Sequence, residues 1–168
     1  MPKEKMIALL YELMKNSRRS DRDLAKILDV SQPTITRMRK KLETNNYLLE
    51  YTIIPNLVKL DFEIVAFTFL NIARTSPEPS VSSEEFMQKT HKWIEKNKNV
   101  IFSGTGEGIR GKNSVVVSLH RDFTEYTRFI SEFRRQWSKN ILDVESFIVT
   151  LKGKMPKSFT FRHLEQPE

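Results

Sequence analysis

The spacing of apolar residues changes once along this chain, near Tyr47, and the change separates two parts with different architectures. Before Tyr47 the apolar residues recur every three or four positions, which is the repeat of an amphipathic helix. After Tyr47, stretches of alternating apolar and polar residues, typical of strands, are interleaved with two further helical stretches. The pattern therefore predicts an α+β protein whose first part is helical and whose second part is mixed.

The first part predicts three helices with short connections. The first covers residues 3–16. The second begins after Ser20, which forms a capping box with Asp23, and the third begins after Ser31 and runs to about residue 45. Pro33 is tolerated in the first turn of that third helix, where its missing N–H costs little. Two short helices with a tight connection, the second rich in Thr, Arg and Lys, indicate a helix-turn-helix.

The second part predicts the order β-α-β-β-α-β, the ferredoxin-like arrangement. A β-like stretch, Tyr47–Ile54, precedes it. The helices are expected to begin after capping residues Ser82 and Asp122, and a Gly-rich hairpin tip is expected over 104–113. The predicted strands are Phe62–Ala73, Val100–Ser103, Ser114–His120 and Ile141–Leu151.

These elements define four segments. Residues 1–50 are the expected winged helix-turn-helix DNA-binding domain, and residues 51–60 are a linking strand or hinge. Residues 61–152 are the expected βαββαβ regulatory and dimerisation domain. Residues 153–168 form a tail in which Phe159 and Phe161 alternate with polar neighbours, a pattern that favours an added edge strand over a nucleic-acid contact.

The strand from Phe62 is apolar on both faces, with Ala66 and Leu70 on one side and Phe67 and Phe69 on the other. Two helices cover only one face of a four-stranded sheet, so the other face needs a different cover. A second copy of the chain is the simplest one, and we therefore expect a homodimer. The alternative is that the tail folds back over this face.

The positive charge of the chain is concentrated at its ends. The formal net charge is +7, with +4 in residues 1–50, +1 in residues 51–151 and +2 in residues 152–168. A basic head on a nearly neutral body suits a protein that binds DNA. The absence of cysteine excludes disulfides and zinc–thiolate sites. The longest nearly apolar run, Ile64–Ala73, is shorter than the roughly 20 residues needed to span a bilayer, so we expect a soluble cytoplasmic protein without a membrane partner.

Two patterns in the sequence suggest a nucleotide or metal site, but the elements around them do not suit such a site. Gly106, Gly108 and Gly111 have the spacing of a dinucleotide fingerprint, but the next predicted element is a strand, whereas the fingerprint needs a helix. The three histidines lie on different elements without metal-ligand spacing. We therefore expect no cofactor and no metal, and we interpret the glycines as a hairpin tip or, alternatively, as an effector or subunit contact.

The chain resembles the Lrp/AsnC family of feast/famine transcriptional regulators. The residues that carry the resemblance are Asp23–Lys26, Val30–Arg37, Lys40–Glu43 and Tyr51–Pro55, followed by the βαββαβ half. The resemblance covers roughly residues 3–152. It implies a homodimer built through the second domain, assembly into octamers, and small effectors, commonly amino acids, bound near subunit edges.

Three features depart from the family pattern. The family usually has an apolar residue at the position of Arg39 and often a basic one at the position of Met38. The loop over 75–83 and the hairpin tip over 104–113 are both longer than expected. The effector-site residues implied at that tip are Gly104, Thr105, Gly106, Glu107, Gly108 and Arg110.

A helical wheel separates the third helix into two sides. With Ile35 at the centre of the buried side, Met38 and Leu42 also face the core. Arg39 lies near the core flank, where it can snorkel. Ser31 and the other residues at the amino end point toward the groove. Candidates for base edges are Gln32, Thr34, Thr36 and Arg37, and candidates for phosphates are Lys40, Lys41, Arg18, Arg19 and Arg22.

Two alternatives to a DNA-binding regulator stay open. Siroheme decarboxylases share this two-part layout and carry histidine and arginine around the middle strands of the second domain. The corresponding stretch here, Val100–Asn113, has Arg110 but no histidine, and the third helix is basic. Both observations favour a regulator that is not an enzyme. The remaining alternative is a regulatory assembly module that binds no DNA.

Overall fold

The computed structural model describes residues 3–73, 83–154, 157 and 159–164. The chain divides into two compact units, one made of residues 1–55 with 157–168 and the other of residues 56–156. Ser82, half of one predicted capping box, and most of the predicted loop over 75–83 lie outside the described residues. No helix among the described residues is long and apolar enough to cross a membrane.

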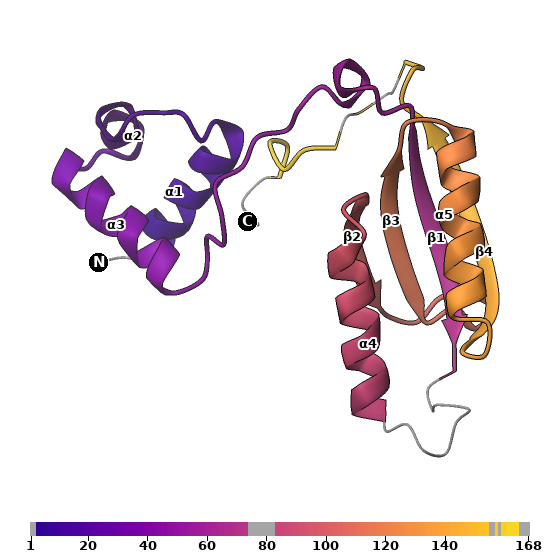
Figure 1. The fold of residues 1–168 in the computed structure, drawn as a ribbon. Coiled ribbons are helices and arrows are strands. Elements are labelled where there is room, and N and C mark those ends of the chain that lie inside the picture. Colours follow the sequence, from indigo (N-terminus) through magenta and orange to yellow (C-terminus); the bar gives the residue numbers. More distant parts are fainter. Residues whose placement is uncertain (1–2, 74–82, 155–156, 158, 165–168) are drawn as a thin grey trace. The chain divides into compact units, whose positions relative to one another are not determined.

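The first unit contains the three predicted helices, α1 (Lys3–Lys15), α2 (Asp21–Leu28) and α3 (Gln32–Thr44) (Figure 1). Each helix contributes apolar side chains at three- and four-residue spacing to one small core. The buried members of this core are Leu9, Leu13, Leu24, Ala25, Ile35, Met38 and Leu42. The predicted helix-turn-helix is confirmed, together with the three residues assigned to the buried side of α3.

The two short helices begin as their capping residues predict, with one difference. The Ser20 hydroxyl accepts a hydrogen bond from the Asp23 N–H (3.1 Å), which satisfies a free donor in the first turn of α2. Ser31 has the extended backbone of a cap for α3, but its side chain makes no hydrogen bond to the helix backbone. Its hydroxyl instead lies 2.8 Å from the Thr34 hydroxyl.

The segment that follows α3 has no strand, although Tyr47–Ile54 was expected to be β-like. It is irregular up to a 3-10 turn, η1 (Leu57–Leu60). Its alternating apolar side chains are largely in water, with Leu49 86% and Ile53 80% exposed. A strand needs a neighbour to pair its N–H and C=O groups, and the described chain offers this segment none.

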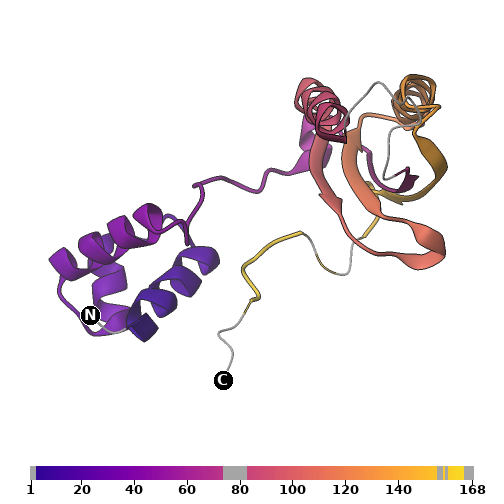
Figure 2. The same cartoon turned by 90° about the horizontal axis from the view of Figure 1, so that it is seen from below.

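The second unit has the predicted β-α-β-β-α-β order. Its four strands form one antiparallel sheet in the order β2-β3-β1-β4, and both helices lie on one side of it (Figures 1 and 2). The prediction of a ferredoxin-like domain is confirmed. The elements are β1 (Ile64–Ile72), α4 (Ser83–Lys96), β2 (Val100–Thr105), a short 3-10 turn η2 (Ile109–Gly111), β3 (Ser114–His120), α5 (Phe123–Gln136) and β4 (Ile141–Thr150).

The helix-covered face of the sheet carries the core of this unit. Alternate residues of β1, among them Ala66 and Leu70, are buried there. Leu70 packs in a cluster with Phe133 of α5, and Trp93 of α4 lies against Phe133 with ring centres 4.9 Å apart. The burial of alternate residues in β1 therefore follows from the two helices that cover this face of the sheet.

The opposite face of the sheet, called the open face below, carries an aromatic row. The strand register aligns Phe102 of β2, Val117 of β3, Phe67 of β1 and Phe147 of β4, so that the row crosses all four strands. Phe102 is 56% and Phe147 67% exposed. The prediction that both faces of β1 are apolar is confirmed.

The described residues of the tail, 157 and 159–164, form bends and turns. The rings of Phe159 and Phe161 touch edge to face, with centres 5.7 Å apart, and both rings are exposed. The sheet has four strands in the described part of the chain, so the edge strand expected from this tail is not found among these residues.

Candidate nucleic-acid interface

The exposed side of α3 carries the polar residues that were assigned to DNA. Ile35, Met38 and Leu42 are fully buried on the other side, which fixes the rotation of the helix in its unit. Thr34 is half-buried. The remaining predicted contacts on or beside this helix are all exposed, namely Ser31, Gln32, Thr36, Arg37, Lys40 and Lys41.

Three of these side chains are linked at the amino end of α3. The hydroxyls of Ser31 and Thr34 share a hydrogen bond, and Arg37 Nη2 lies 3.4 Å from the Thr34 hydroxyl. This arrangement limits the rotamers of Arg37 before any ligand arrives. The Ser31 hydroxyl is turned toward Thr34 and makes no hydrogen bond to the helix backbone, whereas the Ser31 carbonyl accepts from the N–H groups of Thr34 (2.9 Å) and Ile35 (3.2 Å).

Thr36 is exposed, but its hydroxyl is already used. It donates to Asp21 Oδ2 at 2.7 Å and lies 3.3 Å from the Gln32 carbonyl. The hydroxyl therefore ties α3 to the start of α2, and the methyl group is the part of Thr36 that remains for a base edge. This narrows the role predicted for Thr36 to an apolar contact.

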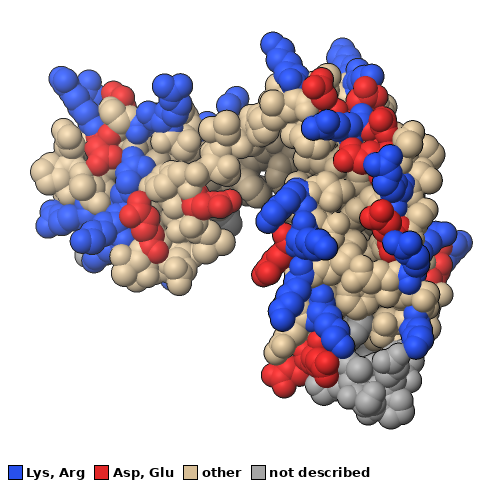
Figure 3. Space-filling model, viewed as in Figure 1, with Lys and Arg blue, Asp and Glu red and all other residues tan. Residues whose placement is uncertain are grey.

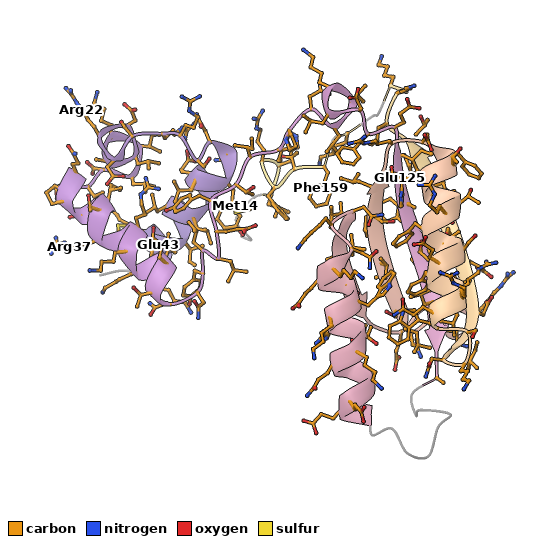
Figure 4. All side chains as sticks on the ribbon, in the orientation of Figure 1. Met14, Arg22, Arg37, Glu43, Glu125 and Phe159 are labelled. Atoms are coloured by element: carbon orange, nitrogen blue, oxygen red, sulfur yellow. The ribbon has the colours of Figure 1, made fainter. Side chains whose placement is uncertain are left out.

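The three arginines around α2 are not equivalent. Arg18 and Arg22 are exposed, whereas Arg19 is half-buried and forms an ion pair with Glu12 of α1. The hydrogen bond from Lys15, followed by the one from Arg19, outweighs burial and holds the pKa of Glu12 below its usual value. Arg22 and Arg37 point outward from α2 and α3 (Figure 4), and Lys and Arg side chains gather on the surface of this unit (Figure 3). Arg19 is thus a bridge to α1.

Arg39 has a role that the sequence did not reveal. Its Nη2 donates to Asp21 Oδ1 (2.8 Å), and its Nη1 donates to the Tyr51 hydroxyl (3.2 Å), which in turn donates to Glu43 Oε1 (2.9 Å). Burial opposes the charge on Asp21, but hydrogen bonds from Thr36 and Arg39 outweigh it and lower the pKa of that carboxyl. Asp21 and Arg39 are 18 positions apart, so no local spacing in the sequence signals their contact.

The hairpin tip that was assigned to an effector borders a depression of about 430 Å³. Gly106, Glu107 and Gly108 line it, together with the ends of β1 and β4. Gly104 and Thr105 belong to strand β2 instead, and Arg110 lies in η2 with its guanidinium 3.7 Å from Glu145. The structure therefore brings half of the predicted residues to one place.

Two lining residues were missed in the sequence. Lys112 is only 6% exposed, and its ammonium pairs with Asp143 and lies 3.4 Å from Glu145. The hydrogen bond from Lys112 holds the pKa of Asp143 below its usual value. The Asn113 amide accepts from the Ile72 N–H (2.9 Å) and donates to the Ile72 carbonyl (2.7 Å), which extends the ladder at the end of β1. A polar pair directly before the strand that starts at Ser114 was the available signal.

The surroundings of the glycine motif match a hairpin and differ from a nucleotide site. The stretch from Gly106 to Gly111 joins β2 to β3, and no helix follows it. Gly111 has a φ of 73°, which only glycine adopts without cost, and a Cβ there would lie 3.3 Å from the Asn71 amide. No cluster of acidic and histidine residues that could hold a metal occurs within the described segments.

The first unit matches a known family model. Residues 3–48 match the family described as winged helix-turn-helix DNA-binding. This range covers α1 to α3, the helices that carry the exposed polar side described above. The winged helix-turn-helix assigned from the sequence to this part of the chain is therefore confirmed.

The whole chain is similar to transcriptional regulators. A curated relative from Pyrococcus abyssi, described as an uncharacterised HTH-type transcriptional regulator, is 29% identical over 145 residues, which is 86% of this chain and 89% of the relative. The structure of an AsnC family transcriptional regulator from Agrobacterium tumefaciens superposes with a TM-score of 0.74 at 19% identity, covering 99% of this chain and 97% of the other. A transcriptional regulator of Neisseria meningitidis in complex with L-Met has a TM-score of 0.76 at 14% identity and covers 96% of each chain.

Proposed function

We propose, on the premise that this chain has the domain order and the fold of the Lrp/AsnC regulators, that it controls transcription by binding specific DNA sequences through α3. The observation that carries the proposal is the two-sided character of this helix. One side is locked into the core by Ile35, Met38 and Leu42, and the other presents exposed polar and basic groups. A helix held in this way can enter the major groove as a rigid body.

The exposed residues divide into two classes of contact. Gln32 and Arg37 have the hydrogen-bonding geometry for adenine and guanine, and the Thr36 methyl suits a thymine methyl. Ser31 and Thr34 hold Arg37 at the amino end of the helix. The phosphate contacts are proposed for Lys40, Lys41, Arg18 and Arg22, because exposed cations without a fixed geometry recognise backbone charge.

The protein acts as a homodimer in this proposal, with the open face as the contact. Phe67, Phe102 and Phe147 form a continuous apolar row in a face that neither helix covers. A two-fold axis through such a row brings each aromatic residue against the same surface of the second copy. Assembly of dimers into octamers follows the family resemblance alone.

A small effector is proposed for the depression beside the hairpin tip. Its lining combines the backbone of Gly106 and Gly108 with the Glu107 carboxylate, and with Lys112 and Asn113, which are held by Asp143 and Ile72. The ammonium group of an amino acid suits the Glu107 carboxylate. The L-Met complex of the Neisseria regulator supports this class of ligand, since that protein shares the fold.

The enzyme alternative has less support from the same region. A decarboxylase acting on a tetrapyrrole needs free cationic or histidine side chains near the middle strands. Here Arg110 lies next to Glu145, and Lys112 pairs with Asp143. We therefore propose that the protein has no catalytic role. We also propose that it is located in the cytoplasm, where it meets DNA. Absence of a spectral change on adding haem to the purified protein is the expected result, and tight tetrapyrrole binding would favour the enzyme.

Selection from a pool of random duplexes, followed by titration at several salt concentrations, tests the proposed function. The selected site is expected to bind at least about 10³-fold more tightly than a scrambled duplex at physiological salt. The logarithm of affinity is expected to fall linearly with the logarithm of salt concentration. A protein that enriches no sequence, or binds all duplexes equally, is not a sequence-specific regulator.

A further inference from the structure

The side chain of Arg39 joins three separate segments of the first unit. Its guanidinium lies on α3, bonds to Asp21 at the start of α2, and bonds to Tyr51 in the linker. Both partners of the ion pair are largely shielded from water, with 21% and 23% of their side-chain surface exposed. The orientation of Arg39 is therefore set by Asp21, and its Nη1 is directed at Tyr51 in the linker.

Tyr51 completes the connection between the linker and α3. Its hydroxyl accepts from Arg39 and donates to Glu43, and the Arg39 guanidinium lies 5.9 Å from the centre of its ring. Burial raises the pKa of the Tyr51 hydroxyl although Arg39 opposes the shift, and the Glu43 carboxylate raises it further. The hydroxyl therefore stays protonated and can donate and accept at once.

Tyr51 lies in the part of the linker where the backbone is no longer hydrogen-bonded to α3. The backbone of the linker is bonded to α3 up to Leu48, whose N–H donates to the Leu42 carbonyl (3.1 Å). Among the described residues, no backbone group from Leu49 to Pro55 is hydrogen-bonded to a helix. Tyr51 makes the side-chain hydrogen bonds from this stretch to α3. Tyr51 thus decides whether the free part of the linker begins after residue 48 or after residue 51.

The length of the free linker matters for a DNA-binding dimer. Three extra free residues add roughly 10 Å of reach, at 3.3–3.6 Å for each extended residue. That distance corresponds to about three base pairs, since stacked bases repeat every 3.4 Å. A dimer whose heads have this additional freedom tolerates half-sites at several separations, whereas a shorter tether restricts it to a few.

We propose that Tyr51 is a positioning residue that selects the spacing between DNA half-sites. By fixing the linker to Arg39 and Glu43, it shortens the tether between each DNA-binding head and the sheet domain. The proposal rests on the proposed function, because it needs a dimer that binds two half-sites.

The test measures binding of the full-length protein to duplexes with two copies of its selected half-site. The centre-to-centre spacing is varied in single base-pair steps across one helical turn. The variant Tyr51→Phe removes one hydroxyl and keeps the ring over Arg39. The matched control is Tyr47→Phe, because Tyr47 is similarly exposed (44% against 49%), lies four residues earlier and has no side-chain hydrogen bond among those observed for the described residues.

The wild type and Tyr47→Phe are expected to prefer their best spacing by about tenfold or more over spacings three base pairs away. Tyr51→Phe is expected to lower this preference to about threefold or less, with little loss at the best spacing. Arg39→Leu removes one of the two partners of the Tyr51 hydroxyl and leaves its hydrogen bond to Glu43, so it should broaden the profile less than Tyr51→Phe. This order of the two variants assigns the effect to the hydroxyl.

Three results would overturn the inference. Equal spacing profiles for the wild type and Tyr51→Phe would show that the hydroxyl does not limit the tether. A uniform loss of affinity at every spacing would reduce Tyr51 to a stabilising contact. A wild type that prefers its half-site but binds all spacings with equal affinity would show that spacing is not selected at all. Failure of the wild type to prefer any half-site is a different outcome and contradicts the proposed function itself.

Discussion

His120 Nε2 lies 2.8 Å from the Ser118 hydroxyl on the helix-covered face of the sheet, and both residues are fully buried. The Asn99 amide nitrogen lies 3.4 Å from the other ring nitrogen, Nδ1. Because an amide nitrogen only donates, Nδ1 accepts, and the proton of the neutral ring is on Nε2. Burial lowers the pKa of His120, although Glu125 opposes the shift. The site therefore accommodates a neutral imidazole.

This geometry predicts a loss of stability in mild acid. The unfolded chain protonates His120 near its ordinary pKa of about 6.5, whereas the folded protein resists protonation. Between the two pKa values the unfolded state binds more protons, so the free energy of unfolding falls as pH drops below about 6.5. One group contributes at most about 1.4 kcal/mol for each pH unit in this window. Chemical denaturation at several pH values from 7 to 5 measures the slope.

The variant His120→Gln is expected to be less stable at neutral pH and to show a shallower dependence on pH. The exposed residue His91 of α4 provides the control, since His91→Gln should keep the wild-type slope. An unchanged slope in His120→Gln would mean that other groups cause the acid sensitivity.

Arg37 and Lys40 are expected to differ in what their loss does to DNA binding. Arg37→Ala should cost roughly 1–3 kcal/mol on the selected site and reduce discrimination between sites, because a base contact is removed. Lys40→Ala should weaken binding to all duplexes about equally and lower the salt slope by about one, because a phosphate contact is removed. Titrations on selected and scrambled duplexes at several salt concentrations measure both quantities.

The control for this pair is Lys3→Ala, which removes an exposed cation at the start of α1, far along the chain from α3. It is expected to leave site discrimination intact. If Arg37→Ala and Lys40→Ala both bind DNA as the wild type does, α3 is not the helix in the groove.

Charges placed on the open face should separate the dimer. In a dimer the double variant Phe67→Asp, Phe69→Asp buries carboxylates without partners, which costs several kcal/mol, whereas a monomer leaves them in water. Light scattering of the full-length variant should therefore give the mass of one chain, with an unchanged circular dichroism spectrum. Phe123→Asp is the control, because Phe123 is exposed in the first turn of α5, where a negative charge is favourable. A wild type that is monomeric at micromolar concentration would contradict the proposed interface.

Filling the depression should abolish effector binding without unfolding the domain. A Cβ on Gly106 would meet no atom within 4 Å, so Gly106→Val adds its methyl groups to empty space beside the lining residues. A ligand present at 100 times its dissociation constant stabilises a protein by about 2.7 kcal/mol, which a thermal-shift screen of amino acids detects. The wild type should respond to at least one compound and Gly106→Val to none. Equal responses would place the ligand elsewhere, and no response from the wild type at millimolar concentrations would leave the hairpin a structural element.

The sequence predicted the elements whose pattern is local. Ser20 and Asp122 begin their helices as expected, because a capping hydrogen bond spans only three residues. The spacing of Ile35, Met38 and Leu42 predicted the buried side of α3 for the same reason. The exposed positions of the helix followed directly, since they are the complement of this stripe.

Features that depend on distant residues could not be predicted. The engagement of Thr36 and Arg39 by Asp21 joins positions 15 and 18 residues apart, and no periodicity signals it. The pairing of Lys112 with Asp143 joins a hairpin to the last strand. The stretch after Tyr47 was assigned a strand-like conformation from its alternation, which reports on the side chains but not on whether a partner strand exists.

If a second copy covers the open face, the lifetime of this protein in the cell depends on its own concentration. A newly made chain keeps Phe102 and Phe147 in water until it meets another, and pairing then adds its free energy to that of the fold. Each tenfold dilution raises the free energy of the dimer relative to its separated chains by about 1.4 kcal/mol and so favours separation. Scarce chains therefore spend more time unpaired and within reach of proteases, so the cell can clear the protein simply by ceasing to make it.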